Sequence, residues 1–552
     1  MIGARVQGDD AARGALRNMK LEMPNIADAS PGQRGGTSAR QVAAFLLIFL
    51  VAIVPVLTTP ILPTIDFYNH VARYFVLSRI DTIRFLAENY QGNWSLLPNI
   101  GMDVLGVGLM RIFPPTLAPH ILTIASMLVQ FSGVMFFSRQ MIGRWSLITA
   151  VLLVPLLYSY IFVWGFANFL LGLGLAFWAA GWWLARRDRL ALAVPVACLF
   201  AVAIFLCHGL AFALYGLLVG ALELAEVLAA PGRRAATAVR SLVALSVQAV
   251  APVAMFMSTT TAKAEKGITS ADESVHRLIE HGDLTHRVTD LVVYRLQTIV
   301  RVAEGPSLWF DIATFILTIG ILAALAIRGR ARLNGRAWPA IAVALALVAL
   351  APPAMFGVGY VADRMPLFLA FIVAGSLDVR AGLDAFGRFC LGLLLVAVAA
   401  RLIFIGVAWR QYAAEFTQFR EVAGRMAPGS LAAEVNVTRA VHVSASSRCE
   451  MYGPLMVVLY GQAAPLFADP TQQPLRIVGP LRQAGETAPS AAGVSDAEAP
   501  AFYSGYIAAA AKAHRFRYLL ICGAERLAEP LPDSAKVIGR TPRFTLLDLK
   551  PS

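Results

Sequence analysis

Residues 165–228 read GFANFLLGLGLAFWAAGWWLARRDRLALAVPVACLFAVAIFLCHGLAFALYGLLVGALELAEVL. The stretch holds three apolar runs, 165–185, 190–207 and 209–228, each close to the roughly 20 residues that cross the hydrocarbon core of a bilayer. An arginine-rich turn separates the first two runs, and His208 alone separates the second from the third. Helices that are apolar on every side are buried in a core or in lipid. The stretch therefore predicts consecutive transmembrane helices.

The composition of the whole chain agrees with this interpretation. Of its 552 residues 58% are hydrophobic and 15% are charged, whereas soluble domains carry about 25% charged residues. The net charge of +13 does not indicate a nucleic-acid partner, because the arginines lie in short loops between apolar runs. Runs of spanning length predict an all-α polytopic membrane bundle of about eleven transmembrane helices. The expected spans are 41–58, 116–137, 146–163, 165–185, 190–207, 209–228, 238–257, 308–327, 338–356, 365–379 and 388–408.

Five arginine clusters predict the orientation of the bundle. All of them fall on one side of the membrane if the N-terminus is cytoplasmic, as the positive-inside rule requires. The clusters lie at 139–144, 186–189, 233–240, 328–336 and 380–388. The expected outer segments are 59–115, 258–307, 357–364 and 409–552. With its Ala-, Leu- and Arg-rich composition, the chain is expected to be a multi-pass protein of a bacterial inner membrane with a periplasmic C-terminal region.

The composition also divides the chain into three expected domains. Residues 1–40 are polar and Gly-rich and are expected to be a disordered cytoplasmic leader, 41–408 form the transmembrane domain, and 409–552 form a small periplasmic α/β domain. Cys449 and Cys522 fall in the last domain and can pair if it is extracytoplasmic. Alternation of β-branched residues predicts its strands. They are expected within 434–445, 454–461, 516–523 and 543–549, after a helical segment that begins near residue 410.

The first outer segment carries a polar stripe. In PTIDFYNHVAR (63–73), Asp66, Asn69, His70 and Arg73 recur at i, i+3, i+4 and i+7, which is one face of a helix lying along the membrane surface. Such a stripe combines a general base (Asp66), a proton partner (His70), a phosphate-binding fork (Arg73) and an acceptor-orienting amide (Asn69). Two alternatives stay open: Asp66 caps the helix, and Arg73 extends to lipid head groups.

Further ionisable residues are expected at the outer end of the bundle. Asp103 is a second carboxylate of the first outer segment, His208 stands at a turn between two spans, and Asp363–Arg364 stand at the mouth of a short span. Ionisable residues in such positions indicate function. His208 and Arg364 are candidates to bind a donor phosphate. Asp363 is a candidate to position these two residues or to contact an acceptor. The alternatives are a helix-end hydrogen bond for His208 and a salt bridge between Asp363 and Arg364.

Three segments resemble the GT-C class of membrane glycosyltransferases: the stretch 63–73, WSLLPNIGMD (94–103) and WGFANFLLGLGL (164–175). The resemblance extends to a polytopic bundle followed by an outer C-terminal domain. It implies a polyprenyl-phosphate-linked sugar donor, a glycan or lipid acceptor, and an inverting transfer at the outer face of the lipid bilayer. It also implies that Asp66 is the base or orients the acceptor.

One departure from the GT-C pattern concerns metal. Several GT-C families have a second acidic residue directly after the aspartate, whereas Phe67 follows Asp66 here. Asp103 takes that role, or the site has no second carboxylate and no metal. A divalent cation, magnesium or manganese, stays open as a cofactor, and no ligand set for one is assigned.

Three other function classes fit the sequence less well than a glycosyltransferase does. A lipid or glycan transporter predicts ionisable residues near the bilayer midplane, whereas the polar groups here gather at the outer interface. An O-antigen-ligase-like protein places its main outer loop late in the chain, whereas the acidic motif here comes early. The hypothesis of a non-catalytic membrane receptor does not explain the polar stripe at 66–73.

Overall fold

The computed structural model describes residues 38–230, 232–259, 284–355, 358–379, 384–437, 449–468, 473–485, 499–513, 515–523 and 535–549. The expected leader, apart from its last three residues, and residues 260–283 of the second outer segment lie outside this range. Among the described residues, eight helices are long and apolar enough to cross a membrane. They span Ala118–Ile142, Leu147–Trp164, Ala167–Arg186, Leu190–Cys207, Gly209–Ala229, Arg234–Ser258, Leu308–Ile327 and Ala385–Ala423.

Eight candidate spans are fewer than the expected eleven. Over the remaining three expected spans, each single helix is shorter than 18 residues. These helices are α2 (Ala39–Ala52), which continues into α3 (Val54–Thr58), α18 (Trp338–Leu350) and α19 (Val361–Ser376).

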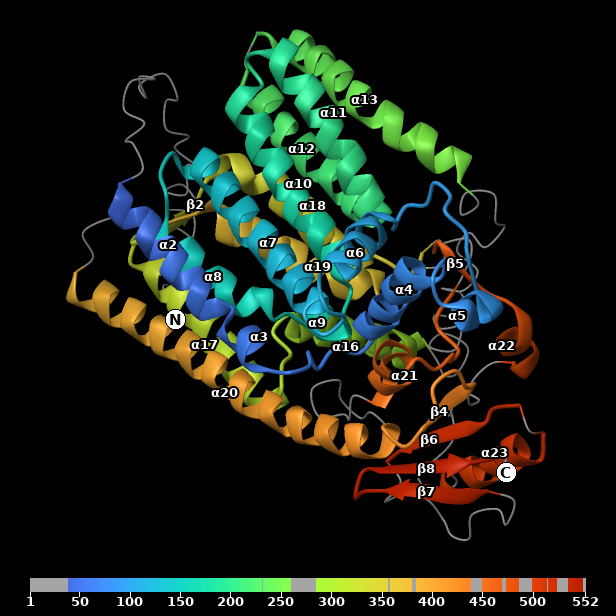
Figure 1. Ribbon diagram of the computed structural model, residues 1–552. Helices are drawn as coiled ribbons and strands as arrows, with labels where there is room; N and C mark the ends of the chain where they lie inside the picture. Colours follow the sequence, from blue (N-terminus) through green and yellow to red (C-terminus); the bar gives the residue numbers. More distant parts are fainter. Residues whose placement is uncertain are drawn as a thin grey trace. The chain divides into compact units, whose positions relative to one another are not determined.

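The centre of the bundle is built on close packing between α7 (Ala118–Ile142) and α10 (Ala167–Arg186), which lie side by side in Figure 1. A Cβ placed on Gly133 would lie 2.4 Å from the carbonyl oxygen of Gly174. A Cβ on Gly174 would lie 2.7 Å from the amide nitrogen of Gln130. Membrane helices approach through small residues in this way, because lipid provides no hydrophobic force to drive them together. The neighbouring helices are α8 (Leu147–Leu157), α9 (Tyr160–Trp164), α11 (Leu190–Cys207), α12 (Gly209–Ala229) and α13 (Arg234–Ser258).

The first outer segment folds into helices, as its polar stripe predicts. Helix α4 (Phe67–Arg79) buries an apolar face that includes Phe67, Tyr68 and Val71. It packs against α6 (Gly101–Ile112), where a Cβ on Gly106 would lie 2.3 Å from the ring of Tyr74, so only glycine permits this approach. The segment is completed by α5 (Arg84–Asn89) and the short strand β1 (Tyr90–Gly92).

The second half of the chain adds the remaining membrane helices. A short antiparallel ribbon, β2 (Ala331–Leu333) with β3 (Leu377–Val379), joins the ends of two helices. Helix α20 (Ala385–Ala423) continues for 39 residues, through the expected domain boundary at 408, and leads into the C-terminal region. The other elements here are α16 (Leu284–Arg301), α17 (Leu308–Ile327) and the 3₁₀ turn η2 (Gly335–Ala337).

The C-terminal region contains a four-stranded sheet of order β4-β6-β8-β7, next to the end of α20 (Figure 1). Strand β4 (Ala432–Asn436) is parallel to β6 (Tyr518–Cys522), and the other pairs are antiparallel. The expected strand at 454–461 is wrong, because this apolar stretch forms α21 (Tyr452–Tyr460). Cys449 and Cys522 form a disulfide with a Cα–Cα distance of 5.8 Å. The remaining elements are η3 (Cys449–Met451), β5 (Leu475–Ile477), α22 (Gly479–Ala484), α23 (Ala499–Ala513), β7 (Lys536–Arg540) and β8 (Phe544–Asp548).

Backbone pairing joins the C-terminal region to the first outer segment. Strands β1 and β5 form an antiparallel pair, with Tyr90 opposite Ile477 and Gly92 opposite Leu475. The hydroxyl of Tyr90 donates to the carbonyl of Ala464 (2.5 Å) and accepts from its amide (3.0 Å). Figure 1 shows β5 beside α5, away from the four-stranded sheet. The two segments, separated by almost 400 residues, thus form one structural unit.

Candidate active site

Asp66 lies at the junction of α9 and α4. The amides of Ile65 and Asp66 donate to the carbonyls of Val163 (3.1 Å) and Trp164 (2.9 Å), which ties the start of α4 to the end of α9. The carboxylate of Asp66 makes no capping hydrogen bond with α4, so the alternative that it is an N-cap is wrong. Its side chain is 28% exposed. Asp66 therefore presents a carboxylate that is held but accessible.

A directional chain of hydrogen bonds leads to this carboxylate. The guanidinium Nη2 of Arg73 lies 2.6 Å from Nδ1 of His70. Because a guanidinium can only donate, Nδ1 accepts and the ring proton of neutral His70 is on Nε2. Nε2 lies 3.1 Å from Oδ2 of Asp66 and donates to it. The amide of Asn69 adds a longer contact to Oδ1 at 3.5 Å, and its own oxygen accepts from the amide of Phe467 at 3.4 Å.

The charges around Asp66 keep it ionised. Burial by itself would raise the pKa of Asp66, but His70 and Arg73 oppose this, and the pKa lies below its ordinary value of 3.8. The group is therefore a carboxylate at neutral pH. It can accept a proton, or a hydrogen bond from a hydroxyl.

Arg73 and Asp103 are brought together from α4 and α6. Nε of Arg73 donates to Oδ1 of Asp103 (2.5 Å) and Nη2 donates to Oδ2 (3.3 Å), and both side chains are only 1% exposed. The sequence-based roles do not match this geometry, because each of the two charges is already paired with the other. Extension of Arg73 to lipid head groups is excluded, because its side chain is buried. The Arg73–Asp103 pair instead orients the His70 ring from the side opposite Asp66.

Arg364 and His208 form a second cluster. Nη1 of Arg364 lies 3.0 Å from Nε2 of His208, and its guanidinium lies over the rings of Phe166 (4.7 Å) and Phe169 (5.0 Å). The side chain is only 4% exposed, and among the described residues it has no carboxylate within ion-pairing distance and its Nε has no partner. A buried cation without a counter-ion is costly. This cluster has the character of an anion-binding site.

His208 faces donors on both sides. Its Nδ1 accepts from the amide of Leu210 at the start of α12 (3.1 Å), rather than donating to a free carbonyl at a helix end. Nε2 faces the guanidinium of Arg364, yet a neutral imidazole has one acceptor nitrogen only. Burial, with Arg364 and His70, lowers the pKa of His208 well below its ordinary value, so the ring is uncharged. One of the two donors is thus left without an acceptor, which an anion at this position would supply.

Asp363 pairs with a residue that the sequence did not indicate. Its Oδ1 lies 3.4 Å from Nη1 of Arg301, at the end of α16, so the expected salt bridge with Arg364 is wrong. Arg301 lies near the end of the second outer segment, and no motif marks it. Arg401, inside α20, pairs with Asp311 at 2.9 Å and is structural.

Trp164 connects the two clusters, through its backbone carbonyl to Asp66 and through its ring to Phe166. The segment that follows Asp66 touches the turn after Trp164, since a Cβ on Gly165 would lie 2.5 Å from the amide of Phe67. Trp164 stacks on Phe166, whose ring lies beneath Arg364. The carboxylate and the buried guanidinium therefore flank one loop.

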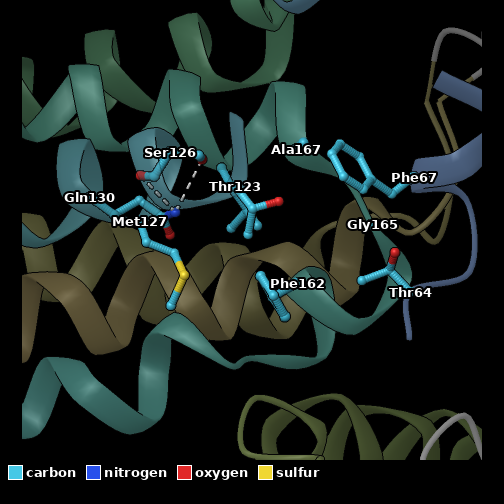
Figure 2. A pocket seen from close by; sticks show the side chains of 10 residues that line it. Thr64, Phe67, Thr123, Ser126, Met127, Gln130, Phe162, Gly165 and Ala167 are labelled. Carbon is cyan, nitrogen blue, oxygen red and sulfur yellow. Dashed lines mark hydrogen bonds between the residues drawn. The ribbon is translucent and has the colours of Figure 1, made fainter. Parts of the chain in front are cut away.

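Beneath Phe67 lies a small cavity of about 20 Å³. Figure 2 shows Thr64, Phe67 and Gly165 on one side of it and the α7 side chains Ser126 and Gln130 on the other. Among the described residues, Oγ1 of Thr64 and Oε1 of Gln130 have no hydrogen-bond partner. Ordered water molecules form hydrogen bonds with buried polar atoms of this kind.

The residues around Asp66 do not fit a divalent cation bound by two carboxylates. Asp103 is occupied by Arg73, and Asp363 by Arg301. Over the described ranges, one group of metal-ligating types comes close enough to share an ion: Glu434 with Cys449 and Cys522. Both sulfurs of this group are in the disulfide, so it offers one ligand.

No protein-family model matches the sequence, and no curated protein was found to be similar to it. Solved structures are similar to the backbone. ArnT from Cupriavidus metallidurans bound to undecaprenyl phosphate has a TM-score of 0.45 and 15% identity, with 93% of this chain and 97% of that chain covered. The Archaeoglobus fulgidus oligosaccharyltransferase tethered with an acceptor peptide has a TM-score of 0.42 and 13% identity, with 88% of this chain and 69% of that chain covered.

The arabinofuranosyltransferase AftD from Mycobacteria has a TM-score of 0.44 and 14% identity, with 94% of this chain and 40% of that chain covered. These three proteins are GT-C glycosyltransferases, the class that the sequence resembles.

Proposed function

We propose that this protein transfers a sugar from a polyprenyl-phosphate-linked donor to a glycan or lipid acceptor of the cell envelope, at the periplasmic face of the membrane. The observation that carries the proposal is the placement of an accessible, ionised carboxylate, Asp66, and a buried cation with no described carboxylate within ion-pairing distance, Arg364, on either side of one loop. A transfer from a phosphate carrier needs a base at the acceptor and a cation at the leaving group.

Asp66 acts as the general base. The acceptor oxygen forms a bond to the anomeric carbon while the bond from that carbon to the phosphate oxygen breaks. The bonding electron pair leaves with the phosphate, and the acceptor proton moves to Asp66. This single displacement inverts the anomeric carbon. The hydrogen bond from His70 orients the carboxylate, and Asn69 restrains its second oxygen.

Arg364 and His208 receive the leaving phosphate. An anion here supplies the counter-charge of the Arg364 guanidinium. It also accepts the hydrogen bond for which the neutral His208 ring has no second acceptor nitrogen. Phe166 and Phe169 keep water away from the guanidinium, which strengthens the interaction. Arg73 and Asp103 are positioning residues in this scheme, since they set the tautomer of His70.

Mass spectrometry of envelope glycans tests the proposal. A deletion strain is compared with the same strain carrying the wild-type gene, the Asp66→Asn variant or the matched control Asp81→Asn, which changes an exposed aspartate of the same segment. The deletion and Asp66→Asn strains should lack one sugar that the other two retain. Identical glycans in all four strains would refute a transferase function.

A further inference from the structure

A second polar cavity lies at the opposite end of the bundle. It has a volume of about 90 Å³ and is lined by the ends of α10 and α12 and the starts of α11 and α13. Helix α11 runs from Leu190 at this cavity to Cys207 beside His208, and its 18 residues are about 27 Å long. The cavity is therefore separate from the Asp66 site and sits among the arginine-rich turns.

A network of hydrogen bonds holds the inner wall of this cavity. Glu223 is only 7% exposed and accepts from Nε1 of Trp183 (2.8 Å), from Nη1 of Arg187 (3.4 Å) and from the hydroxyl of Ser241. Arg187 also pairs with Glu226 at 2.9 Å. The wall is thus pre-formed, and its buried carboxylate is already saturated with donors.

Two charged side chains at the cavity remain free to meet a ligand. Arg240 and Asp188 are exposed, and neither forms an ion pair with any residue that the structure describes. The known contact of the Arg240 guanidinium is a hydrogen bond from one nitrogen to the carbonyl of Arg187. Glu226 forms ion pairs with Arg187 and Arg336, but it is 25% exposed and adds a second carboxylate that a ligand can reach. The free groups therefore have both signs.

An apolar surface borders the cavity. Along α13, Thr237, Ser241 and Ala244 line the cavity, while Val243 and Val247, on the adjoining face of the helix, are 57% and 46% exposed. Apolar side chains this exposed on a membrane helix contact lipid tails. A ligand in the cavity therefore has lipid beside it.

We propose that this cavity binds the head group of a zwitterionic phospholipid, one that carries a phosphate and an ammonium. Arg240 donates to the phosphate, and Asp188 and Glu226 accept from the ammonium. The acyl chains lie along the apolar face of α13. An anionic head group would meet the uncompensated carboxylate of Asp188, and a cationic one would meet the guanidinium of Arg240, so the mixed lining selects for both charges together. This site is independent of the proposed sugar transfer.

Native mass spectrometry of the full chain in detergent tests the site, with phosphatidylethanolamine and phosphatidylglycerol added in equal amounts. The wild type should retain one phosphatidylethanolamine, in preference to phosphatidylglycerol by about tenfold, which corresponds to one charged hydrogen bond. Arg240→Gln and Asp188→Asn should each reduce this preference to near unity. Both residues are exposed, so neither variant should change the unfolding temperature.

Arg233→Gln is the matched control, because Arg233 is an exposed arginine at the same end of α13 that does not line the cavity. It should retain the wild-type preference. Equal retention of both lipids by the wild type, or loss in the control as large as in Arg240→Gln, would overturn the proposal. So would displacement of the lipid by soluble glycerophosphoethanolamine at equal concentration, since the site would then recognise a free solute.

Discussion

Nε2 of His70 lies 3.1 Å from Oδ2 of Asp66 and carries its proton toward that oxygen, because Arg73 occupies the other ring nitrogen. This one hydrogen bond fixes the direction of the accessible Asp66 carboxylate, the proposed base. The consequences for activity and stability can be measured separately.

Asp66→Asn should reduce sugar transfer by about 10²- to 10⁴-fold, the usual contribution of a general base. The amide keeps the shape of the side chain but cannot take a proton. Activity is measured on purified protein, once the glycan comparison has identified donor and acceptor. Asp81→Asn should be as active as the wild type, and full activity of Asp66→Asn would remove Asp66 as the base.

Asp103→Leu should destabilise the protein by about 3–5 kcal/mol, because it leaves the Arg73 charge buried and unpaired. The double variant Arg73→Met with Asp103→Leu should recover most of that loss, since it removes both charges. It should not recover activity, because His70 loses its orienting donor. Thermal unfolding in detergent and the transfer assay give the two readouts. Recovery of activity in the double variant would contradict the positioning role.

Arg364→Gln should raise KM for the lipid-linked donor by about tenfold or more and leave KM for the acceptor nearly unchanged, because it removes the counter-charge of the leaving phosphate. The control is Arg84→Gln, which changes a 93% exposed arginine of the first outer segment. An equal effect of Arg364→Gln on both KM values would place the phosphate elsewhere.

Stability should fall on acidification because of His208. The pKa of its ring is well below 6.5 in the folded chain and near 6.5 in the unfolded chain, so the unfolded state binds the extra proton as pH falls through that range. The loss is at most about 1.4 kcal/mol per pH unit below 6.5.

The variant His208→Asn isolates this effect, because Asn can still accept from Leu210 at the start of α12. Its unfolding temperature should fall less than that of the wild type between pH 7.5 and about 5.5. Parallel curves for the two proteins would show that His208 is not the group responsible.

Gly174→Ala should destabilise the bundle by about 1–3 kcal/mol, the range for overpacking. The added methyl would press on the backbone of Gln130, which cannot move without shifting α7. Gly216→Ala is the control, because nothing lies within 4 Å of its Cβ, and it should change stability by no more than about 1 kcal/mol. Equal unfolding temperatures for the two variants would contradict the close packing of α7 and α10.

The helix at 67–79 was predictable because its polar residues repeat with helical period, and that period depends on local sequence alone. The partner of Arg73 was not predictable, since Asp103 is 30 residues away and reaches it only after α4 and α6 have packed. The same limit applies to Arg301 and Asp363, which are 62 residues apart.

In the C-terminal region, the prediction at 454–461 failed because a short apolar run fits a strand and a buried helix equally well. Pro454 lies in the first turn of α21, where the missing amide costs no hydrogen bond. Strands β1 and β5 have three residues each, too few to show alternation. Their pairing is a long-range event that no local pattern encodes.

The β1–β5 pairing also constrains membrane topology by parity. Two strands joined through their backbones share one side of any bilayer, so the chain between them must cross an even number of times. Eight candidate spans within the described ranges lie between β1 and β5, and counting α18 and α19 as a further pair leaves the number even. The first outer segment and the C-terminal sheet are thus committed to the same compartment.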